Sequence, residues 1–270
     1  AATIAAKAPI SFMKKTLFGL DLEQFEDNDL GIFRDIYRLF KKWGWNKGDA
    51  IEEWAEKLMF ELTKKENITL KELYEFSGIH CTLTYWSFRY RKTKYADHIN
   101  QPDMRVAEAI RMSSSIPIYY QAVWRKFLNK DDKELMDALL DGGTMDNYPI
   151  HILHSQGVPA AKIMGFKLCG TKELNEYKAE REGEDYDYGM PDGFKDALVV
   201  LIGSMRQTAM KVHVHKKDWM LTVKTNVGDL TSTDFDMTDE QKNWLFNNGE
   251  IAMRKYLKEV RGYLLRGEHP

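Results

Sequence analysis

The sequence has 270 residues, 43% of them hydrophobic and 30% charged, and its 39 Lys and Arg residues against 41 Asp and Glu residues leave a net charge of −2. This composition is typical of a globular protein with a full core, and it excludes the global basic field that collects nucleic acid. The longest candidate membrane segment, Ala197–Ile202, is far shorter than the roughly 20 apolar residues that span a bilayer. Cys81 and Cys169 are the only cysteines, so we expect no disulfide framework and a cytoplasmic location.

Two helices are expected at the start of the chain. Alanines favour a helix over Ala1–Ala8, which Pro9 ends. Apolar residues at helical spacing then predict a helix over Asp27–Trp43, with charged residues on its other face. Trp43 and Trp45, close to several lysines, fit either a lipid surface or ordinary packing, and packing is the more common use of such residues.

A further pair of helices is expected before the first strand. Asp49 is the expected cap of one helix, and Thr69 with Glu72 forms a capping box that opens a shorter helix ended by Gly78. We interpret residues 20–78 as a helical cover. It lies either over a sheet edge or over the functional site, and the sequence leaves both options open.

A hairpin is expected next. The β-branched and aromatic residues of Cys81–Phe88 predict a strand, Arg89–Lys92 a turn, and Thr93–Ala96 the returning strand. The cations and aromatic rings of Arg89–Lys94 suit a phospholipid headgroup patch or a nucleic-acid contact. A solvated hairpin tip is the more common explanation of such a cluster.

The centre of the chain holds a helix, strands and a glycine turn. Pro102–Pro117 predicts the helix, and the charged tip within Trp124–Lys133 predicts a loop between strands. Asp141 then follows a short apolar run and precedes Gly142 and Gly143. It is expected just beyond the carboxyl end of a buried strand, where α/β proteins often carry their functional residues. An ordinary turn, in which Asp and Gly serve the backbone alone, is the alternative.

The next part of the chain changes from a strand to a polar segment. Lys162–Cys169 predicts a strand, and Lys172–Tyr188 predicts a solvated loop. Carboxylates cluster within Glu182–Asp187, but their spacing matches no EF-hand calcium loop. The apolar segment Gly193–Val212 predicts a buried helix.

The last part of the chain is expected to hold a strand and a long helix. His213 and His215 alternate as many strand residues do, and a metal site is the alternative. No third ligand at suitable spacing accompanies them, and a structural or surface role is preferred. Asp218–Thr225 predicts a strand. A capping box of Thr238 and its partner three residues later opens a helix that is expected to run to about residue 265.

Three motifs occur in order along the chain: the helix segment Pro102–Pro117, the turn Asp141–Gly143 and the Asn-x-Pro of Asn147–Pro149. Together they resemble the patatin-like phospholipase family. The resemblance continues through Thr233–Lys242 to about Lys258 and so covers most of the chain. It implies an α/β fold of three layers (α/β/α) around a mostly parallel central sheet. It also implies a single domain over residues 1–270 whose N-terminal part is incomplete.

The resemblance also implies a site. In this family a Ser-Asp dyad hydrolyses acyl esters of lipids, with the serine in a G-x-S-x-G turn behind a glycine-rich oxyanion segment. It makes Asp141 the catalytic base, within the motif Asp141–Gly143, and places Ser115, Pro117 and Asn147 along the site. No G-x-S-x-G occurs in the sequence, so we expect the serine to lie upstream of Ala1 and this chain alone to be inactive.

Three functions are weighed against one another. The first is a lipid acyl hydrolase that needs no metal or cofactor and contacts lipid or phospholipid, with peripheral contact to membranes. The second is a catalytically dead protein of the same fold that binds lipid or a protein partner. The third is a nucleic-acid binder that uses Arg89–Lys94, and the near-neutral net charge speaks against it.

Overall fold

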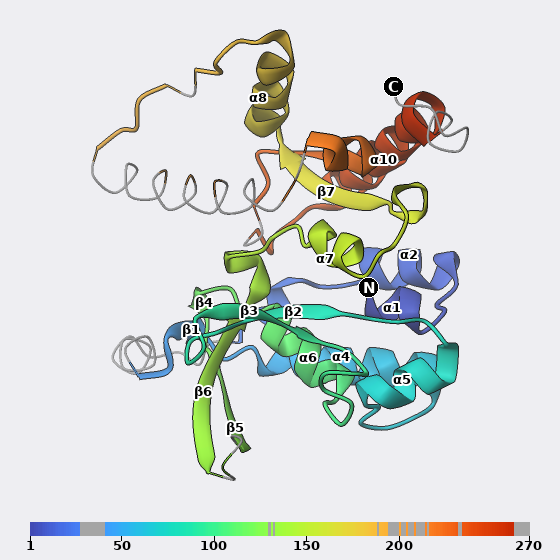
Figure 1. The fold of residues 1–270 in the computed structure, drawn as a ribbon, viewed down its shortest axis with the longest axis vertical. Coiled ribbons are helices and arrows are strands. Elements are labelled where there is room, and N and C mark those ends of the chain that lie inside the picture. Colours follow the sequence, from blue (N-terminus) through green and yellow to red (C-terminus); the bar gives the residue numbers. More distant parts are fainter. Residues whose placement is uncertain are drawn as a thin grey trace. The chain divides into compact units, whose positions relative to one another are not determined.

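The computed structural model describes residues 1–27, 41–128, 131, 133–187, 189–193, 200, 204, 208, 214, 216–231 and 234–261 (Figure 1). The chain divides into two compact units, Ala1–Asn147 and Tyr148–Pro270, which are described separately. The expectation of one domain over residues 1–270 stays a prediction. Among the described helices, none is long and apolar enough to cross a membrane.

The described part of the first unit combines helices with two sheets. In chain order its elements are α1 (Ala2–Ala5), α2 (Ile10–Phe18), the 3-10 helix η1 (Glu23–Phe25), β1 (Gly44–Asn46), α4 (Asp49–Thr63), α5 (Leu70–Ser77), β2 (Leu83–Ser87), β3 (Lys92–Ala96), α6 (Val106–Ser113), β4 (Ile118–Tyr120), β5 (Val123–Leu128), β6 (Glu134–Asp141) and the 3-10 helix η2 (Gly142–Thr144).

The described part of the second unit places helices around one pair of strands. Its elements are α7 (Ile150–Ser155), the 3-10 helix η3 (Ala160–Lys162), β7 (Gly165–Gly170), α8 (Thr171–Glu182), the 3-10 helix η4 (Lys216–Leu221), β8 (Thr222–Gly228), α10 (Asp239–Tyr256) and the π-helical turn η5 (Leu257–Arg261).

Both units mix helices with strands, which confirms the expected α/β fold class. Parallel pairing, expected for the central sheet, joins β1 to β4 and β7 to β8. The four-stranded sheet, in the order β3-β2-β6-β5, is antiparallel. Only residues 88–91 separate β2 from β3 and only residues 129–133 separate β5 from β6, and neighbouring strands joined by so few residues run antiparallel. The register places Asp141, the last residue of β6, opposite Tyr85 of β2.

The core of the first unit lies between the four-stranded sheet and helices α1, α4, α5 and α6. Helices α4 and α5 contribute Leu58, Met59 and Leu73 to the same buried cluster as Tyr85 and Leu139 of the sheet. These two helices therefore pack on the sheet, and the burial of their apolar face supplies much of their stability.

Several predicted elements of the first unit are found, with changes at their ends. The hairpin of β2 and β3 and the helix α6 are confirmed, and α5 opens with the predicted capping box, in which the Thr69 hydroxyl accepts a hydrogen bond from the Glu72 backbone N–H. Strand β1 and helix α2 were not predicted. Residues 28–40 of the helix expected over Asp27–Trp43 lie outside the described residues.

The cap of α4 differs from the prediction. Asp49 is the first helical residue, and Gly48 occupies the cap position. The free N–H groups of Gly48 and Ala50 donate instead to the carboxylate of Asp27, at 2.6 and 3.0 Å. Asp27, 21 positions before Gly48 in the sequence, thus accepts the hydrogen bonds that a local capping side chain normally accepts.

Two predictions in the second unit are wrong. Lys172–Glu182 belongs to helix α8 instead of a solvated loop, because its Lys, Glu, Leu and Ala residues favour helix and Gly183 ends the helix in a left-handed conformation with φ 79°. Residues Asp218–Leu221 lie in the 3-10 helix η4, so the strand expected from Asp218 begins only at Thr222. The Thr222 hydroxyl donates to the Asp218 carbonyl at 2.7 Å, which fixes this turn.

Other expectations for the second unit have mixed outcomes. Strand β7 and the capping box of Thr238 and Gln241 at the start of α10 are confirmed. Most of Gly193–Val212, both His213 and His215, and the predicted end of the last helix beyond Arg261 lie outside the described residues.

Replacement of a core residue of α4 should be far more costly than replacement of its neighbour. The Met59 side chain is 0% exposed and that of Phe60 is 44% exposed. We expect Met59→Ala to lower the free energy of unfolding by about 2–5 kcal/mol and Phe60→Ala to change it by less than about 0.5 kcal/mol. Urea unfolding of both variants measures the difference. Equal losses would contradict the placement of this helix.

Candidate active site

The Asp-Gly-Gly turn is built directly onto the end of a buried strand. Ala138, Leu139 and Leu140 of β6 are each 4% exposed, and Asp141 ends the strand in a half-buried position. The backbone N–H of Asp141 donates to the carbonyl of Ser115 at 2.9 Å. The hydrogen bond to Ser115, in the segment after α6, therefore fixes the position of the residue at which the chain leaves the sheet.

The carboxylate of Asp141 has a defined orientation. Its Oδ1 accepts a hydrogen bond from the backbone N–H of Gly143 at 2.9 Å. A Cβ atom added to Gly143 would lie 3.3 Å from each carboxylate oxygen of Asp141 and 2.9 Å from Oδ1 of Asn147. The side chains of Asp141 and Asn147 therefore lie next to each other over the bare backbone of Gly143.

Gly142 is required for a different reason. It is buried, and a Cβ atom there would lie 2.6 Å from the carbonyl carbon of Thr84 in β2. Because that neighbour is backbone, it cannot swing away as a side chain would. The close approach of the turn to β2 therefore requires glycine at this position.

A buried arginine holds the segment that receives Asp141. Arg111 of α6 is 4% exposed, and its guanidinium donates to the Ser115 hydroxyl at 2.5 Å, to the Gln121 carbonyl at 3.0 Å and to the Lys47 carbonyl. Burial lowers the pKa of Arg111 from its ordinary value, while the carboxylate of Asp27 opposes this effect. An arginine remains charged under such conditions, so its three acceptors are strongly bound.

The structure separates the roles of the predicted site residues. Asp141 and Asn147 are brought together. Ser115 contacts Asp141 through its carbonyl, whereas its hydroxyl is fully buried between the Arg111 guanidinium and the Arg111 carbonyl, to which it donates at 2.7 Å. Pro117 is half-buried in the turn that leads into β4. Ser115 thus packs against Arg111 and positions the turn through its carbonyl. No sequence pattern had indicated that Arg111 holds this segment in place.

A second pairing of serine and aspartate occurs nearby and has a structural role. The hydroxyl of Ser87 donates to Asp137 at 2.5 Å, and the backbone N–H of Arg89 donates to the same carboxylate at 2.9 Å. Ser87 is 0% exposed and Asp137 is 4% exposed. A substrate cannot reach either group, so this pair fixes the turn between β2 and β3.

The turn after Asp141 is also held from its far side. The backbone N–H of Asp146 donates to the Gly142 carbonyl at 2.9 Å, and the hydroxyl of Tyr95 donates to the Asp146 carboxylate at 3.2 Å. Burial and the charge of Asp146 raise the pKa of Tyr95 to about 12. The neutral phenol is therefore the form that the folded protein favours.

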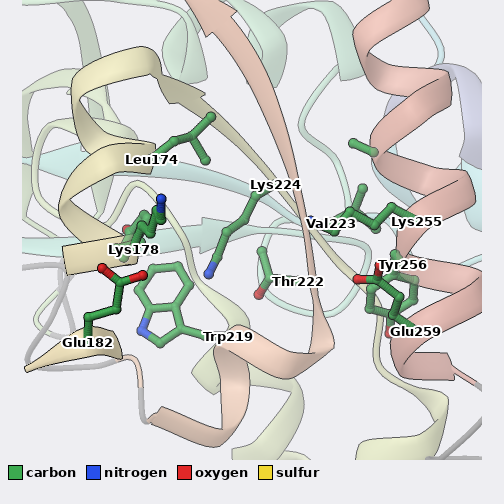
Figure 2. Close-up of a pocket in the computed structure, with 12 residues that line it drawn as sticks. Leu174, Lys178, Glu182, Trp219, Thr222, Val223, Lys224, Lys255, Tyr256 and Glu259 are labelled. Atoms are coloured by element: carbon green, nitrogen blue, oxygen red, sulfur yellow. The ribbon is translucent and has the colours of Figure 1, made fainter. Parts of the chain in front are cut away.

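The second unit contains a cavity of about 750 Å³ that the sequence did not predict (Figure 2). Figure 2 shows Lys224 extending from β8 toward Trp219, with Leu174, Lys178 and Glu182 on the same side and Lys255, Tyr256 and Glu259 on the other. The Lys224 ammonium lies 4.5 Å from the centre of the Tyr177 ring and 5.2 Å from that of Trp219. The cavity mixes aromatic walls with charges of both signs.

A single methyl group at Gly142 should disturb the turn. We expect Gly142→Ala to lower the free energy of unfolding by about 1–3 kcal/mol, because the added Cβ overlaps the β2 backbone. Gly249→Ala in α10 is the matched control, since its Cβ would lie 4.0 Å from the nearest atom, Cγ2 of Thr225. That control should be neutral or more stable by up to about 1 kcal/mol. Chemical unfolding compares the two variants, and similar losses would argue against the close approach.

The Tyr95 hydrogen bond predicts a loss of stability in alkali. A folded-state pKa of about 12 lies above the ordinary value of 10.0, so the stabilising contribution is complete below about pH 10 and disappears as the pH rises through 12. We expect Tyr95→Phe to be less stable than the natural protein at neutral pH and to show a shallower decline above pH 10. Unfolding curves between about pH 8 and 12 test this; parallel declines would contradict the shifted pKa.

Comparison with known proteins extends these observations. Residues 1–154 match the family described as patatin-like phospholipase. A protein of Acanthamoeba polyphaga mimivirus is 22% identical over 260 residues, which cover 95% of this chain and 78% of that protein. The protein YqhO of Bacillus subtilis is 24% identical over 229 residues, covering 82% of this chain and 70% of that protein.

A solved structure shares the fold. VipD from Legionella pneumophila aligns with a TM-score of 0.54 and 15% sequence identity over 96% of this chain, and this chain spans 59% of VipD. The likeness supports the patatin version of the α/β fold. The family match covers more than half of the chain and includes the Asp141 turn. The chain therefore belongs to the patatin-like phospholipase family, a family of lipid hydrolases.

Proposed function

We propose that the protein is a serine-type lipid acyl hydrolase in which Asp141 is the general base of a Ser-Asp dyad. The observation that carries the proposal is the turn itself. Half-buried Asp141 ends a strand and is followed by two glycines. Its carboxylate accepts a hydrogen bond from the Gly143 N–H, and the side-chain oxygen of Asn147 also lies beside the Gly143 backbone. Membership of the patatin-like family supports the same chemistry.

The proposed reaction follows ordinary acyl transfer. Asp141 accepts the proton of a serine hydroxyl as the serine oxygen attacks the ester carbonyl carbon. Backbone N–H groups stabilise the negative oxygen of the tetrahedral intermediate. Its collapse breaks the bond to the alcohol, which leaves with the proton that Asp141 had taken. Water, deprotonated by Asp141, then attacks the acyl carbon of the acyl-enzyme. The bond from that carbon to the serine oxygen breaks, the carboxylic acid leaves, and the serine oxygen recovers the proton from Asp141.

The proposed nucleophile is a serine in a G-x-S-x-G turn that follows a glycine-rich oxyanion segment. We propose that it lies outside these 270 residues, since no G-x-S-x-G occurs within them. The buried Ser87–Asp137 pair is not a candidate, because neither side chain is accessible.

The surroundings of Asp141 suit a positioned base. The Gly143 N–H fixes one carboxylate oxygen, and the side-chain oxygen of Asn147 lies, like that carboxylate, beside the backbone of Gly143. A base restrained in this way loses little freedom when it meets the serine, which favours proton transfer. Asn147 is thus proposed as a positioning residue, and Pro117 as part of the wall beyond the turn.

The proposed substrate is a lipid or phospholipid ester, and the proposed setting is cytoplasmic, with peripheral contact to membranes. The competing proposal is a catalytically dead protein of the same fold that binds lipid or a partner protein. It is favoured by one observation, the absence of G-x-S-x-G from the sequence. Activity measurements on the complete natural protein separate the two.

Loss of the Asp141 carboxylate should remove most activity without unfolding the protein. In the complete natural protein we expect Asp141→Asn to lower kcat/KM on phospholipid and on a soluble short-chain ester by about 10²- to 10⁴-fold. Its circular dichroism spectrum should be unchanged, because asparagine can still accept the Gly143 hydrogen bond. Asp103→Asn, at an exposed carboxylate, is the control and should keep full activity.

Two outcomes would contradict the proposal. Retained hydrolysis by folded Asp141→Asn would remove Asp141 from the mechanism. Ester turnover by residues 1–270 alone would show that the nucleophile lies within them.

A further inference from the structure

One end of the four-stranded sheet carries exposed aromatic rings. The Trp43 ring lies 4.9 Å from that of Phe88 and 5.0 Å from that of Trp124, measured between ring centres. Their exposed fractions are 38%, 44% and 39%. These three rings form a contiguous exposed apolar patch, and such patches often mark an interaction site.

A second group of rings occupies the same end of the sheet. The exposed ring of Tyr90 lies 5.8 Å from that of Phe127, and the Lys94 ammonium lies 3.7 Å from the centre of the Tyr90 ring and 5.9 Å from that of Phe127. We call Trp43, Phe88, Tyr90, Trp124 and Phe127 the aromatic end of the sheet.

The two groups lie on opposite faces of the sheet. Trp124 and Phe127 are three residues apart on β5, so their side chains point to opposite faces. Aromatic rings thus border the same end from both sides, and Figure 1 shows the β5–β6 hairpin extending past helices α4 to α6. Rings on both faces suit a sheet end that inserts into the headgroup region of a bilayer. They suit less well a single flat face that packs against another protein.

The charges at the aromatic end are predominantly positive. The segment Phe88–Lys94 contains four cations and no acid, although the whole chain has a net charge of −2. Arg91 and Lys92 are exposed at the turn. On β5, Lys126 is paired with Glu134 at 2.6 Å, so the positive charge is concentrated on the turn between β2 and β3.

We propose that the aromatic end docks the protein on the surface of a bilayer that contains anionic phospholipid. Trp, Tyr and Phe rings favour the boundary between headgroups and acyl chains, and Lys and Arg beside them are attracted by the anionic surface. The proposal rests on the proposed lipid hydrolase function and names the surface through which the protein meets its substrate. It also accounts for two separate features of the sequence, the tryptophans near lysines around Trp43 and the cations and rings of Arg89–Lys94. The contact of Trp43 with Phe88 brings these two features together.

The register sets where this surface lies relative to Asp141. Trp124 is paired with Ala138, three residues before Asp141 on β6, and Phe127 is paired with Leu135. At a rise of about 3.4 Å per residue, the rings begin roughly 10 Å along the strand from Asp141 and reach about twice that distance. Docking therefore concentrates the protein on the bilayer without placing these rings among the reacting groups.

The test compares matched variants in the complete natural protein. Phe88→Ser has its control in Phe60→Ser, since both side chains are 44% exposed. Lys92→Glu has its control in Lys71→Glu, at another exposed lysine. Sedimentation with vesicles of phosphatidylcholine and phosphatidylserine, and with vesicles of phosphatidylcholine alone, measures binding. Hydrolysis of a soluble short-chain ester is measured in parallel.

We expect Phe88→Ser and Lys92→Glu each to weaken binding to anionic vesicles by about fivefold or more. Both controls should bind normally, and all four variants should keep their activity on the soluble ester. Unchanged vesicle binding by Phe88→Ser and Lys92→Glu would overturn the proposal. So would salt-sensitive retention on DNA that Lys92→Glu abolishes and Phe88→Ser leaves intact, which would indicate nucleic-acid binding.

Failure of the proposed function has a different signature. If the protein is not a hydrolase, the soluble ester is not hydrolysed by any form, whereas vesicle binding still depends on Phe88 and Lys92. If only the docking surface is wrong, hydrolysis persists and the variants bind vesicles as the natural protein does.

Discussion

A buried positive charge connects the packing of the first unit to its candidate site. The Arg111 guanidinium draws together the Lys47 carbonyl before α4, the Ser115 hydroxyl after α6 and the Gln121 carbonyl before β5. Burying such a charge is costly unless it is fully hydrogen-bonded, and each of these acceptors offsets part of that cost. Because the Ser115 carbonyl in turn receives the Asp141 N–H, the place where the Asp-Gly-Gly turn leaves the sheet depends on this network.

A hydrogen bond between serine and aspartate is not sufficient to identify a dyad. Ser87 and Asp137 form one at 2.5 Å, yet both are buried, and the carboxylate also closes a turn through the Arg89 N–H. Asp141 differs in that the residue is half-buried and its carboxylate lies over the bare backbone of Gly143. A catalytic carboxylate needs space for a partner, and the missing side chain of Gly143 provides that space.

Local patterns in the sequence predicted the elements whose stabilising contacts are themselves local. The capping boxes at Thr69 and Thr238 and the hairpin of β2 and β3 depend on residues a few positions apart, and the structure contains them. The cap of α4 was missed because its acceptor, Asp27, is remote in the sequence. Helix α8 was mistaken for a loop because its polar composition outweighed its helix-forming residues in the interpretation. For the site, the motif marked Asp141 and placed Asn147 beside it, whereas the contacts of Arg111 with Lys47, Ser115 and Gln121 required the fold.

The most direct test of the central proposal is a crystal structure of the complete natural protein after reaction with a fluorophosphonate, which labels an active serine covalently. The distance from the Asp141 carboxylate to the labelled serine oxygen is the decisive measurement. We expect a hydrogen-bonding distance of about 2.6–3.2 Å. A labelled serine well beyond hydrogen-bonding reach, or an Asp141 carboxylate bound in an ion pair, would contradict the assignment of Asp141 as the base.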